Sequence, residues 1–312
     1  MQKRFPMSLA CAALFGALAI ALTTTPLAGR AAATNRTIYV SVVDKSGAPV
    51  TDVQPADLEV KEGGKTMEIV SIKPATTPLR VAIVDSDAGY GAFQAGIGQF
   101  MQKLLGKAEF SITSVIVQPK KILDYSSDAP VLSKALSEIG PRGVQRGGQL
   151  MEAISEATSD LRAEGKRSVM LVTRVGGEAS TSMQSKDVRD RLRKSGATMY
   201  VIAIKGAANS TQSTSSATKM GAEQQAVHDD EATESSNNLE QLLGDGSKES
   251  GGHYDEVVSV AAAKMMAALG DEVLQTYQVV YAVPDGTKAS DKLQVSTKRK
   301  NVNLYAPNRP PQ

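Results

Sequence analysis

The order of apolar and polar residues divides the chain into two kinds of segment. Residues 36–72 alternate between apolar and polar positions and contain the turn sequences DKSGAP and EGGK, which predicts about four short strands. From Leu79 onward, continuous apolar stretches alternate with segments whose apolar residues recur every three or four positions. Apolar strands separated by amphipathic helices predict a mostly parallel sheet that is covered on both faces.

Residues 79–275 are therefore expected to form a doubly wound α/β domain of the Rossmann type, and Pro74 and Pro78 mark its start. The expected strands are residues 79–85, 110–117, 120–125, 167–173 and 198–204, with an edge strand next to the sequence SGGHYDEV. The expected helices are residues 92–106, 130–139, 149–164, 186–196, 237–246 and 260–277.

The C-terminal residues 276–312 return to an alternation of period two and contain a Pro-Asp-Gly turn. The strands that this segment can form are too few to fold alone, because an isolated hairpin is only marginally stable in water. We therefore expect them to pair with the strands of residues 34–76. Both ends of the chain would then build one small, sandwich-like β domain, into which the α/β domain is inserted.

Residues 206–236 are rich in serine and threonine and nearly free of large apolar side chains. Such a segment cannot bury enough apolar surface to offset the entropy of ordering, so it is expected to be a mobile insertion. His228, Asp229 and Asp230 lie within it and are interpreted as solvated residues and not as a metal site.

Residues 1–33 follow the pattern of a secretory signal peptide, with Lys3 and Arg4 before an apolar run at residues 7–22. A cleaved signal is the favoured interpretation, and a retained membrane anchor is the alternative, since the run is short for a span of about 20 residues. The single cysteine, Cys11, lies in this run, so the mature chain is expected to contain no thiol and no disulfide. The expected location is periplasmic or extracellular, with no membrane span in the mature chain.

The composition of the chain argues against a nucleic-acid partner. With 312 residues and 41% hydrophobic content, the chain can bury a core and fold as a globular protein. Its 35 basic and 33 acidic residues occur in mixed order and give a net charge of +2, so no nucleic-acid partner is expected. The absence of tryptophan and the 4% aromatic content also remove most stacking surfaces for bases.

The candidate site lies at the carboxyl ends of the predicted parallel strands, where ligands bind in open α/β sheets. Three loops that are distant in sequence are expected to meet at this edge. The candidate partner-binding residues are Asp85, Ser86, Asp87, Gly89, Gly148, Gln149, Thr173 and Arg174.

The order of these elements over residues 79–275 resembles that of the von Willebrand factor A (vWA) domain. The flanking sequences VSVVDKSGAPVTDVQPADLEVKEGGKTMEI and YQVVYAVPDG are similar to those of exported bacterial proteins described as VWFA-related, and they are the more specific signal. The chain is therefore identified as a VWFA-related domain protein of the exported bacterial type.

In that family, the motifs D-x-S-x-S, G-G-T and S-D-G hold Mg²⁺ or a similar hard cation and leave one position open for a carboxylate of the partner. Asp85 matches the first aspartate, and Thr173 stands at the serine before the second one. The other ligand positions are occupied by Asp87 and Gly89 instead of the serines, Gly148 instead of the threonine, and Arg174 instead of the second aspartate. The resemblance thus implies a degenerate metal-ion-dependent adhesion site.

We expect no cofactor, since glycines supply no ligand oxygen and a guanidinium repels Mg²⁺. Cation-dependent adhesion through the weak metal candidates Asp85 and Asp87 is the alternative. Arg174 is expected to bind Asp85 or Asp87 as an internal counter-ion, unless the two aspartates only cap the next helix or close the turn and Arg174 is solvated. Glu178 and Asp124 are interpreted as loop charges without a functional signal.

A catalytic function is not expected. The sequence GYGAFQ begins like a dinucleotide-binding fingerprint, but Gln94 stands in the place of its third glycine. A hydrolase needs an activated nucleophile, and beyond the signal segment the chain has no cysteine and only His228 and His253 as histidines. The sequence predicts an exported, non-catalytic binding or scaffold module. Its partner is expected to be another protein, docking at the candidate site or adding a strand to the small β domain.

Overall fold

The computed structural model describes residues 33–144, 147–179, 181–206, 233–284 and 290–310. The predicted signal peptide, with Cys11, lies outside the described residues except for residue 33. The predicted insertion, with His228, Asp229 and Asp230, lies outside them from residue 207 to residue 232. In the described part of the chain, no helix has both the length and the apolar character needed to cross a membrane.

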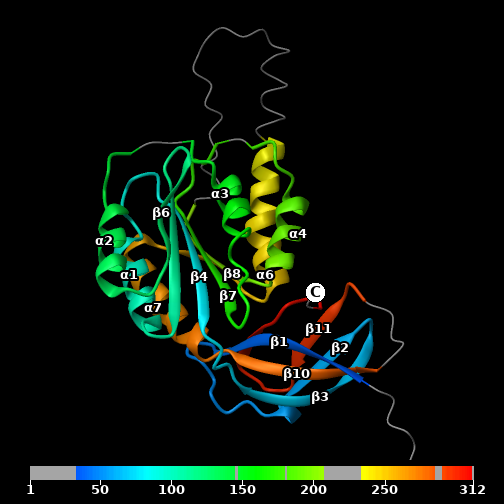
Figure 1. Cartoon of the computed structure of the whole chain (residues 1–312). Coiled ribbons are helices and arrows are strands. Elements are labelled where there is room, and N and C mark those ends of the chain that lie inside the picture. Colours follow the sequence, from blue (N-terminus) through cyan, green and yellow to red (C-terminus); the bar gives the residue numbers. More distant parts are fainter. Residues whose placement is uncertain (1–32, 145–146, 180, 207–232, 285–289, 311–312) are drawn as a thin grey trace, which may run out of the picture.

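The α/β domain is built on a sheet whose described strands follow the order β6-β5-β4-β7-β8-β9 (Figure 1). Neighbouring strands are parallel except for β5 and β6, which are antiparallel. The predicted fold class, a mostly parallel α/β sheet, is confirmed by this arrangement. The strands are β4 (Leu79–Ser86), β5 (Ala108–Val115), β6 (Pro119–Ser126), β7 (Arg167–Arg174), β8 (Thr198–Ile204) and β9 (Tyr254–Val257).

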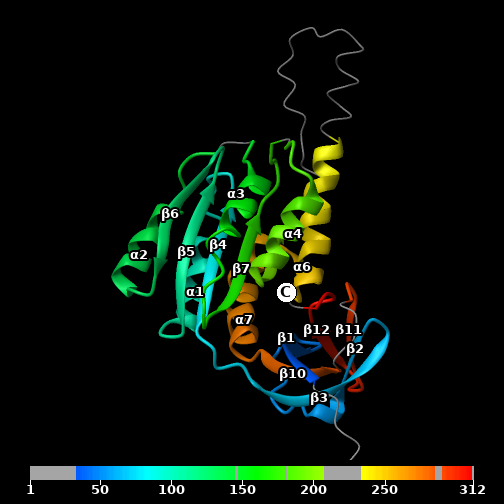
Figure 2. The same ribbon diagram turned by 45° about the vertical axis from the view of Figure 1, so that its right-hand side comes forward.

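Helices cover both faces of this sheet (Figures 1 and 2). Side chains alternate between the faces along each strand, so Ile83 of β4 packs in one apolar core and Val84 packs in the other. This burial on both sides explains why the strands read as continuous apolar stretches. One face carries α1 (Gln94–Leu104), α2 (Ala129–Glu138) and α7 (Ala262–Leu274), and the other carries α3 (Leu150–Ala157) and α4 (Ser185–Ser195).

A further helical segment on the face of α4 spans residues 233–250 and includes a π-helical turn, η3 (Leu242–Gly246), and α6 (Ser247–Ser250). It begins inside the predicted mobile insertion, so the prediction is wrong for residues 233–236. The reason is local anchoring, because Ser235 is buried and its hydroxyl accepts a hydrogen bond of 2.7 Å from the Thr181 amide.

The second sheet combines strands from both ends of the chain, in the order β11-β2-β3-β10-β1-β12. β10 lies between β1 and β3 and is antiparallel to both. Val40, Val60 and Tyr281, from three different strands, are fully buried in its core. The strands are β1 (Ala33–Asp44), β2 (Leu58–Glu62), β3 (Lys65–Pro74), β10 (Tyr277–Pro284), β11 (Leu293–Thr297) and β12 (Val302–Tyr305).

The N-terminal segment forms three described strands where the alternation predicted about four. The stretch between β1 and β2 is irregular and ends in a 3-10 turn, η1 (Pro55–Asp57). Its start is fixed by Asp44, whose carboxylate accepts hydrogen bonds from the amides of Ser46 (2.7 Å) and Ala48 (3.0 Å).

The two connections between the small sheet and the α/β domain lie side by side. The Ala75 amide, on the way into the α/β domain, donates a hydrogen bond of 2.8 Å to the carbonyl of Thr276, on the way out. The small sheet therefore lies at the amino ends of the parallel strands (Figure 1). The carboxyl ends, with the candidate residues, face away from it.

Candidate partner-binding site

The aspartate at the end of β4 pairs with the neighbouring strand β7. Asp85 lies opposite Thr173 in the parallel register, and the Thr173 hydroxyl donates a hydrogen bond of 2.6 Å to Asp85 Oδ1. Both side chains are buried. The third loop reaches the same edge, since the Ala179 amide beyond β7 donates to the Gly148 carbonyl over 3.1 Å. The structure thus brings the three predicted loops together.

Asp87 closes the turn that follows β4. Its Oδ1 accepts a hydrogen bond of 2.8 Å from the Gly89 amide, and its Oδ2 accepts one from the Gly91 amide. These bonds confirm the alternative in which an aspartate closes the strand-to-helix turn. The side chain of Asp87 is fully buried.

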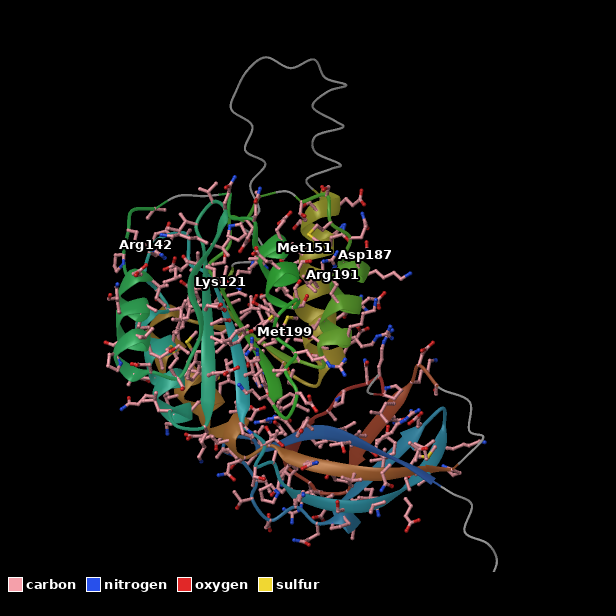
Figure 3. The ribbon with its side chains drawn as sticks, in the orientation of Figure 1. Lys121, Arg142, Met151, Asp187, Arg191 and Met199 are labelled. Carbon is pink, nitrogen blue, oxygen red and sulfur yellow. The ribbon has the colours of Figure 1, made fainter. Side chains whose placement is uncertain are left out.

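Arg142 supplies the positive charge beside Asp87. Its Nη2 lies 3.3 Å from Asp87 Oδ1, and its Nη1 donates a hydrogen bond of 2.9 Å to the Ser114 hydroxyl at the end of β5. Arg142 follows α2 in an irregular loop at the edge of the domain (Figure 3). Sequence reasoning missed it, although the dipeptide Pro-Arg between two glycines is a visible cationic signal in the glycine loop.

Arg174 is not the counter-ion of either aspartate, so the predicted pairing is wrong. Arg174 lies opposite Ser86 in the register, and its side chain therefore leaves the sheet on the face opposite to Asp85 and Thr173. There its Nε and Nη2 donate to the two carboxylate oxygens of Glu178 over 2.9 and 3.0 Å.

Glu178 is thus the buried ion-pair partner of Arg174, a structural role that its interpretation as a loop charge did not foresee. The remaining nitrogen of the Arg174 guanidinium, Nη1, donates a hydrogen bond of 2.5 Å to Glu240 Oε1 in the helical segment 233–250. The side chain of Arg174 is 0% exposed, so the alternative of a solvated Arg174 is wrong as well. This arginine joins β7 to a helix and is closed to ligands.

Asp85 has an unusual electrostatic environment. Burial removes its carboxyl group from water, and the nearby charge of Asp87 further disfavours ionisation. The Thr173 hydrogen bond and the more distant Arg142 act in the opposite direction, and the net effect raises the pKa of Asp85 to about 7.

The glycines at the hydroxyl positions of the motif are required by close backbone packing. Gly89 has φ +83°, and a Cβ there would lie 2.3 Å from the carbonyl oxygen of Gly143. A Cβ on Gly148 would lie 3.1 Å from the carbonyl oxygen of Ile116. A serine or threonine therefore does not fit the present backbone without a shift of the loops.

The donor set does not fit an octahedral magnesium site. Asp85 and Asp87 supply carboxylate oxygens, but those of Asp87 already accept from two amides and Arg142, and Gly89 and Gly148 have no side-chain oxygen. A guanidinium occupies the position of the second aspartate. Among the residues that the structure describes, no group of three or more His, Cys, Asp or Glu side chains has the arrangement of a metal site.

Most of the candidate residues are buried, whereas apolar side chains around them are exposed. Seven of the eight are buried, and Gln149 is half-buried. Tyr90, Val117 and Val144 are 50%, 43% and 52% exposed. They follow β4, β5 and α2, and they share one edge because the Gln149 amide donates to the Val117 carbonyl (2.9 Å) and the Arg142 amide to the Gly89 carbonyl (3.0 Å).

No protein-family model matches the sequence, and the comparison with curated proteins gives no match. The chain is similar in structure to an aerotolerance-related membrane protein from Bacteroides fragilis, at 17% identity and a TM-score of 0.42, over 62% of this chain and 98% of that one. It is also similar to a von Willebrand factor type A protein from Catenulispora acidiphila, at 9% identity and a TM-score of 0.43, over 89% of this chain and 74% of that one.

A third similar structure is proximal thread matrix protein 1 from the mussel byssus with a zinc-occupied MIDAS motif, at 11% identity and a TM-score of 0.43. The match covers 73% of this chain and 50% of that one. The fold follows from the sheet itself, since the order of strands and helices that the resemblance implied is the one observed. The α/β domain thus has the mostly parallel, doubly wound fold that the resemblance to the vWA domain implied.

Proposed function

We propose that this protein is an exported, non-catalytic vWA-like module that binds another protein, without a metal ion, through the carboxyl edge of its α/β sheet. One observation carries the proposal: at this edge the two aspartates and Arg174 are buried and bonded to other protein groups, whereas three apolar or aromatic side chains, Tyr90, Val117 and Val144, are exposed. A cation-dependent module would present the opposite arrangement, with open carboxylate and hydroxyl oxygens.

Hydrogen bonds and an ion pair hold the loops of the proposed surface in place. Asp87 and Arg142 fix the loops that carry Tyr90 and Val144, so little conformational entropy is lost when a partner orders them. Tyrosine is enriched in protein interfaces because it combines a large apolar ring with a polar hydroxyl. Export is inferred from the signal-like residues 1–33.

The test is capture of binding proteins from the native cell envelope by the tagged chain in the presence of EDTA. Capture is expected to persist in EDTA and to fall about tenfold or more for the double variant Tyr90→Ser, Val144→Ser, as for central interface residues. The matched control is Val260→Ser, which removes an apolar side chain that is 94% exposed elsewhere. It is expected to bind like the wild type.

Thermal unfolding tests independently whether the protein binds a divalent cation. Added Mg²⁺ or Mn²⁺ is expected to leave the melting temperature unchanged, because a ligand stabilises only a protein that binds it. A melting temperature that rises with the cation and falls again with EDTA would contradict metal independence. Undiminished capture by the double variant would contradict the proposed surface.

A further inference from the structure

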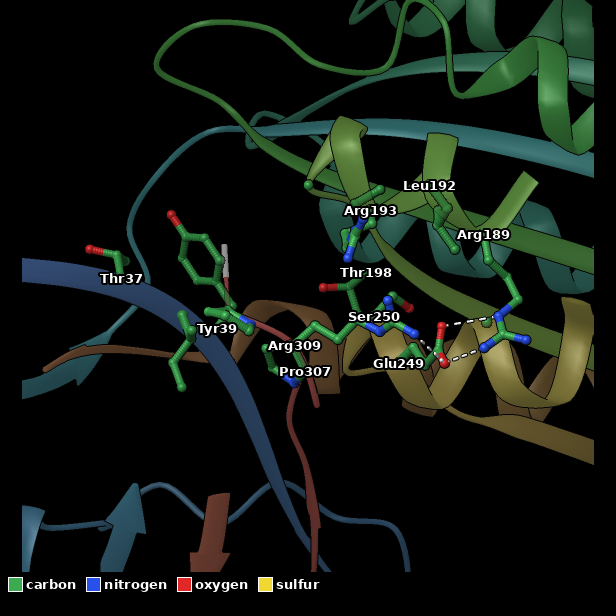
Figure 4. Close-up of a pocket in the computed structure, with 15 residues that line it drawn as sticks. Thr37, Tyr39, Arg189, Leu192, Arg193, Thr198, Glu249, Ser250, Pro307 and Arg309 are labelled. Carbon is green, nitrogen blue, oxygen red and sulfur yellow. Dashed lines mark hydrogen bonds and ion pairs between the residues drawn. The ribbon is translucent and has the colours of Figure 1, made fainter. Parts of the chain in front are cut away.

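A second polar site lies at the opposite end of the α/β domain, between it and the small sheet. Two cavities of about 400 and 160 Å³ adjoin there and share Tyr39, Arg193 and Gly196 in their walls. Figure 4 shows the smaller one, with Tyr39 from β1 and Arg193 from the end of α4. The cleft is separate from the candidate partner-binding site, so its function does not depend on the function proposed above.

Basic side chains outnumber acidic ones in the walls of this cleft. Seven lysines and arginines line the two cavities, against Glu164 and Glu249 as the acidic residues. Glu249 is already held by Arg189, whose Nε donates to it over 3.0 Å, as Figure 4 shows. The cleft therefore has an excess of positive charge, which attracts an anion.

Arg167 is the most unusual of these cations. It is 4% exposed, and its Nη2 donates to the carbonyl of Val273 at the end of α7. Its buried Nε has no hydrogen-bond partner, and within the described residues no carboxylate forms an ion pair with it. A buried guanidinium without a counter-ion is costly, so the site is suited to an anion that would supply one.

Arg193 lies in the wall common to both cavities and also has a buried donor without a partner. Among the residues that the structure describes, its Nε has no hydrogen-bond partner, and its Nη2 forms one ion pair, with Asp190 at 3.4 Å. The carboxyl ends of α4 and α7 carry partial negative charge, which favours cations near them. Arg167 has only a backbone carbonyl as its described partner, and the contact of Arg193 with Asp190 uses one of its donors, so donors on both arginines are left for a ligand.

Apolar residues complete the smaller cavity. Ile38, Leu192 and Pro307 line it next to the basic side chains. A ligand that fills the cleft must therefore combine negative charge with apolar groups. Volumes of a few hundred Å³ suit a short peptide segment or another small ligand.

We propose that this cleft binds an acidic peptide segment of a partner protein, with its carboxylates on Arg167 and Arg193 and an apolar side chain against Leu192. The guanidinium fork matches a carboxylate in geometry and charge. The ligand would contact both sheets and would bridge them.

Isothermal titration of the full chain tests this proposal with a blocked peptide of alternating glutamate and leucine. The matched probe replaces each glutamate by glutamine. The glutamate peptide is expected to bind, more weakly at higher salt, and the glutamine peptide is expected not to bind. Arg193→Gln should lower the affinity about tenfold or more, as for a lost charge-assisted hydrogen bond. The control is Arg191→Gln, an exposed position on the same helix (Figure 3) that lines neither cavity.

Arg167→Gln is expected to abolish binding, and circular dichroism shows whether this variant folds. Arg193 and Arg309 are more exposed, so the double variant Arg193→Gln, Arg309→Gln keeps the proposal testable if Arg167→Gln does not fold. The proposal is overturned if the two peptides bind alike, if neither binds, or if the double variant binds like the wild type. It is also overturned if inorganic phosphate binds and the acidic peptide does not.

Discussion

At the scale of single residues, Asp85 is a carboxyl group whose surroundings favour the neutral form. Burial and the neighbouring Asp87 raise its pKa from 3.8 to about 7. The folded state therefore holds a proton on Asp85 over a pH range in which the unfolded chain has lost it. Its contribution to stability is fully present below the unfolded pKa and is lost as the pH rises through about 7.

Asp85→Asn is expected to remove this pH dependence. The amide keeps an oxygen for the Thr173 hydroxyl and does not ionise. The stability of the variant relative to the wild type should therefore rise as the pH rises from about 4 to about 8. The shift corresponds to roughly 4 kcal/mol as an upper limit. Urea denaturation at several pH values measures it. Asp124→Asn, at a carboxylate that is 80% exposed, is the control. Parallel pH profiles for wild type and Asp85→Asn would contradict the raised pKa.

At the scale of elements, the turn after β4 decides whether this domain can hold a cation. Restoring the serine of the motif by Gly89→Ser is expected to destabilise the protein without creating a metal site. The φ of +83° is unfavourable for serine, and its Cβ would lie 2.3 Å from the Gly143 carbonyl oxygen. Together these effects should lower the free energy of unfolding by about 2–4 kcal/mol.

Gly47→Ser is the matched control for this substitution. Gly47 also has φ +83°, but no atom lies within 4 Å of the position that a Cβ would take there. Serine at this position is therefore destabilising only because of its backbone conformation. That cost is about 1 kcal/mol or somewhat more. Equal destabilisation of the two variants in urea would show that the contact with Gly143 is unimportant. A melting temperature of Gly89→Ser that rises with Mg²⁺ would show that the missing hydroxyl alone prevents metal binding.

The elements of the α/β domain could be predicted because burial on both faces leaves a clear pattern. The strands around Ile83 and Leu171 are apolar at successive positions, and α1 shows apolar residues at helical spacing. The start of the helical segment 233–250 could not be predicted. It depends on the tertiary contact between Ser235 and Thr181, which are distant in the chain.

The site was predictable only where strand geometry determines it. Asp85 and Thr173 are neighbours because they lie on adjacent parallel strands. Side chains alternate between the two faces along a strand, so Arg174, the next residue after Thr173, lies on the opposite face. The pair of Arg142 and Asp87 spans 55 residues and involves an irregular loop, for which no periodicity exists. The sequence therefore indicated a cation supplied by the protein but not the correct arginine.

At the scale of the whole molecule, the small sheet depends on both ends of the chain. β10 lies between β1 and β3, and β12 pairs with the second half of β1. Among the described strands, β1 has no partner once the C-terminal strands are removed, and β2 and β3 remain as an isolated hairpin. Such a hairpin is marginally stable in water, so we propose that the small domain folds only from both segments together.

Truncation after Gln275 tests this dependence. The α/β domain is expected to stay folded, whereas residues 33–74 should lose protection because Val40, Val60 and Met67 lose the core that Tyr281 completes. Limited trypsin digestion with mass spectrometry should then show rapid cleavage at Lys61 and Lys65. Truncation after residue 308 is the control, since it retains all the described strands of the sheet. Trypsin resistance of residues 33–74 in the shorter chain would mean that the N-terminal strands fold alone and that the two-ended domain is wrong.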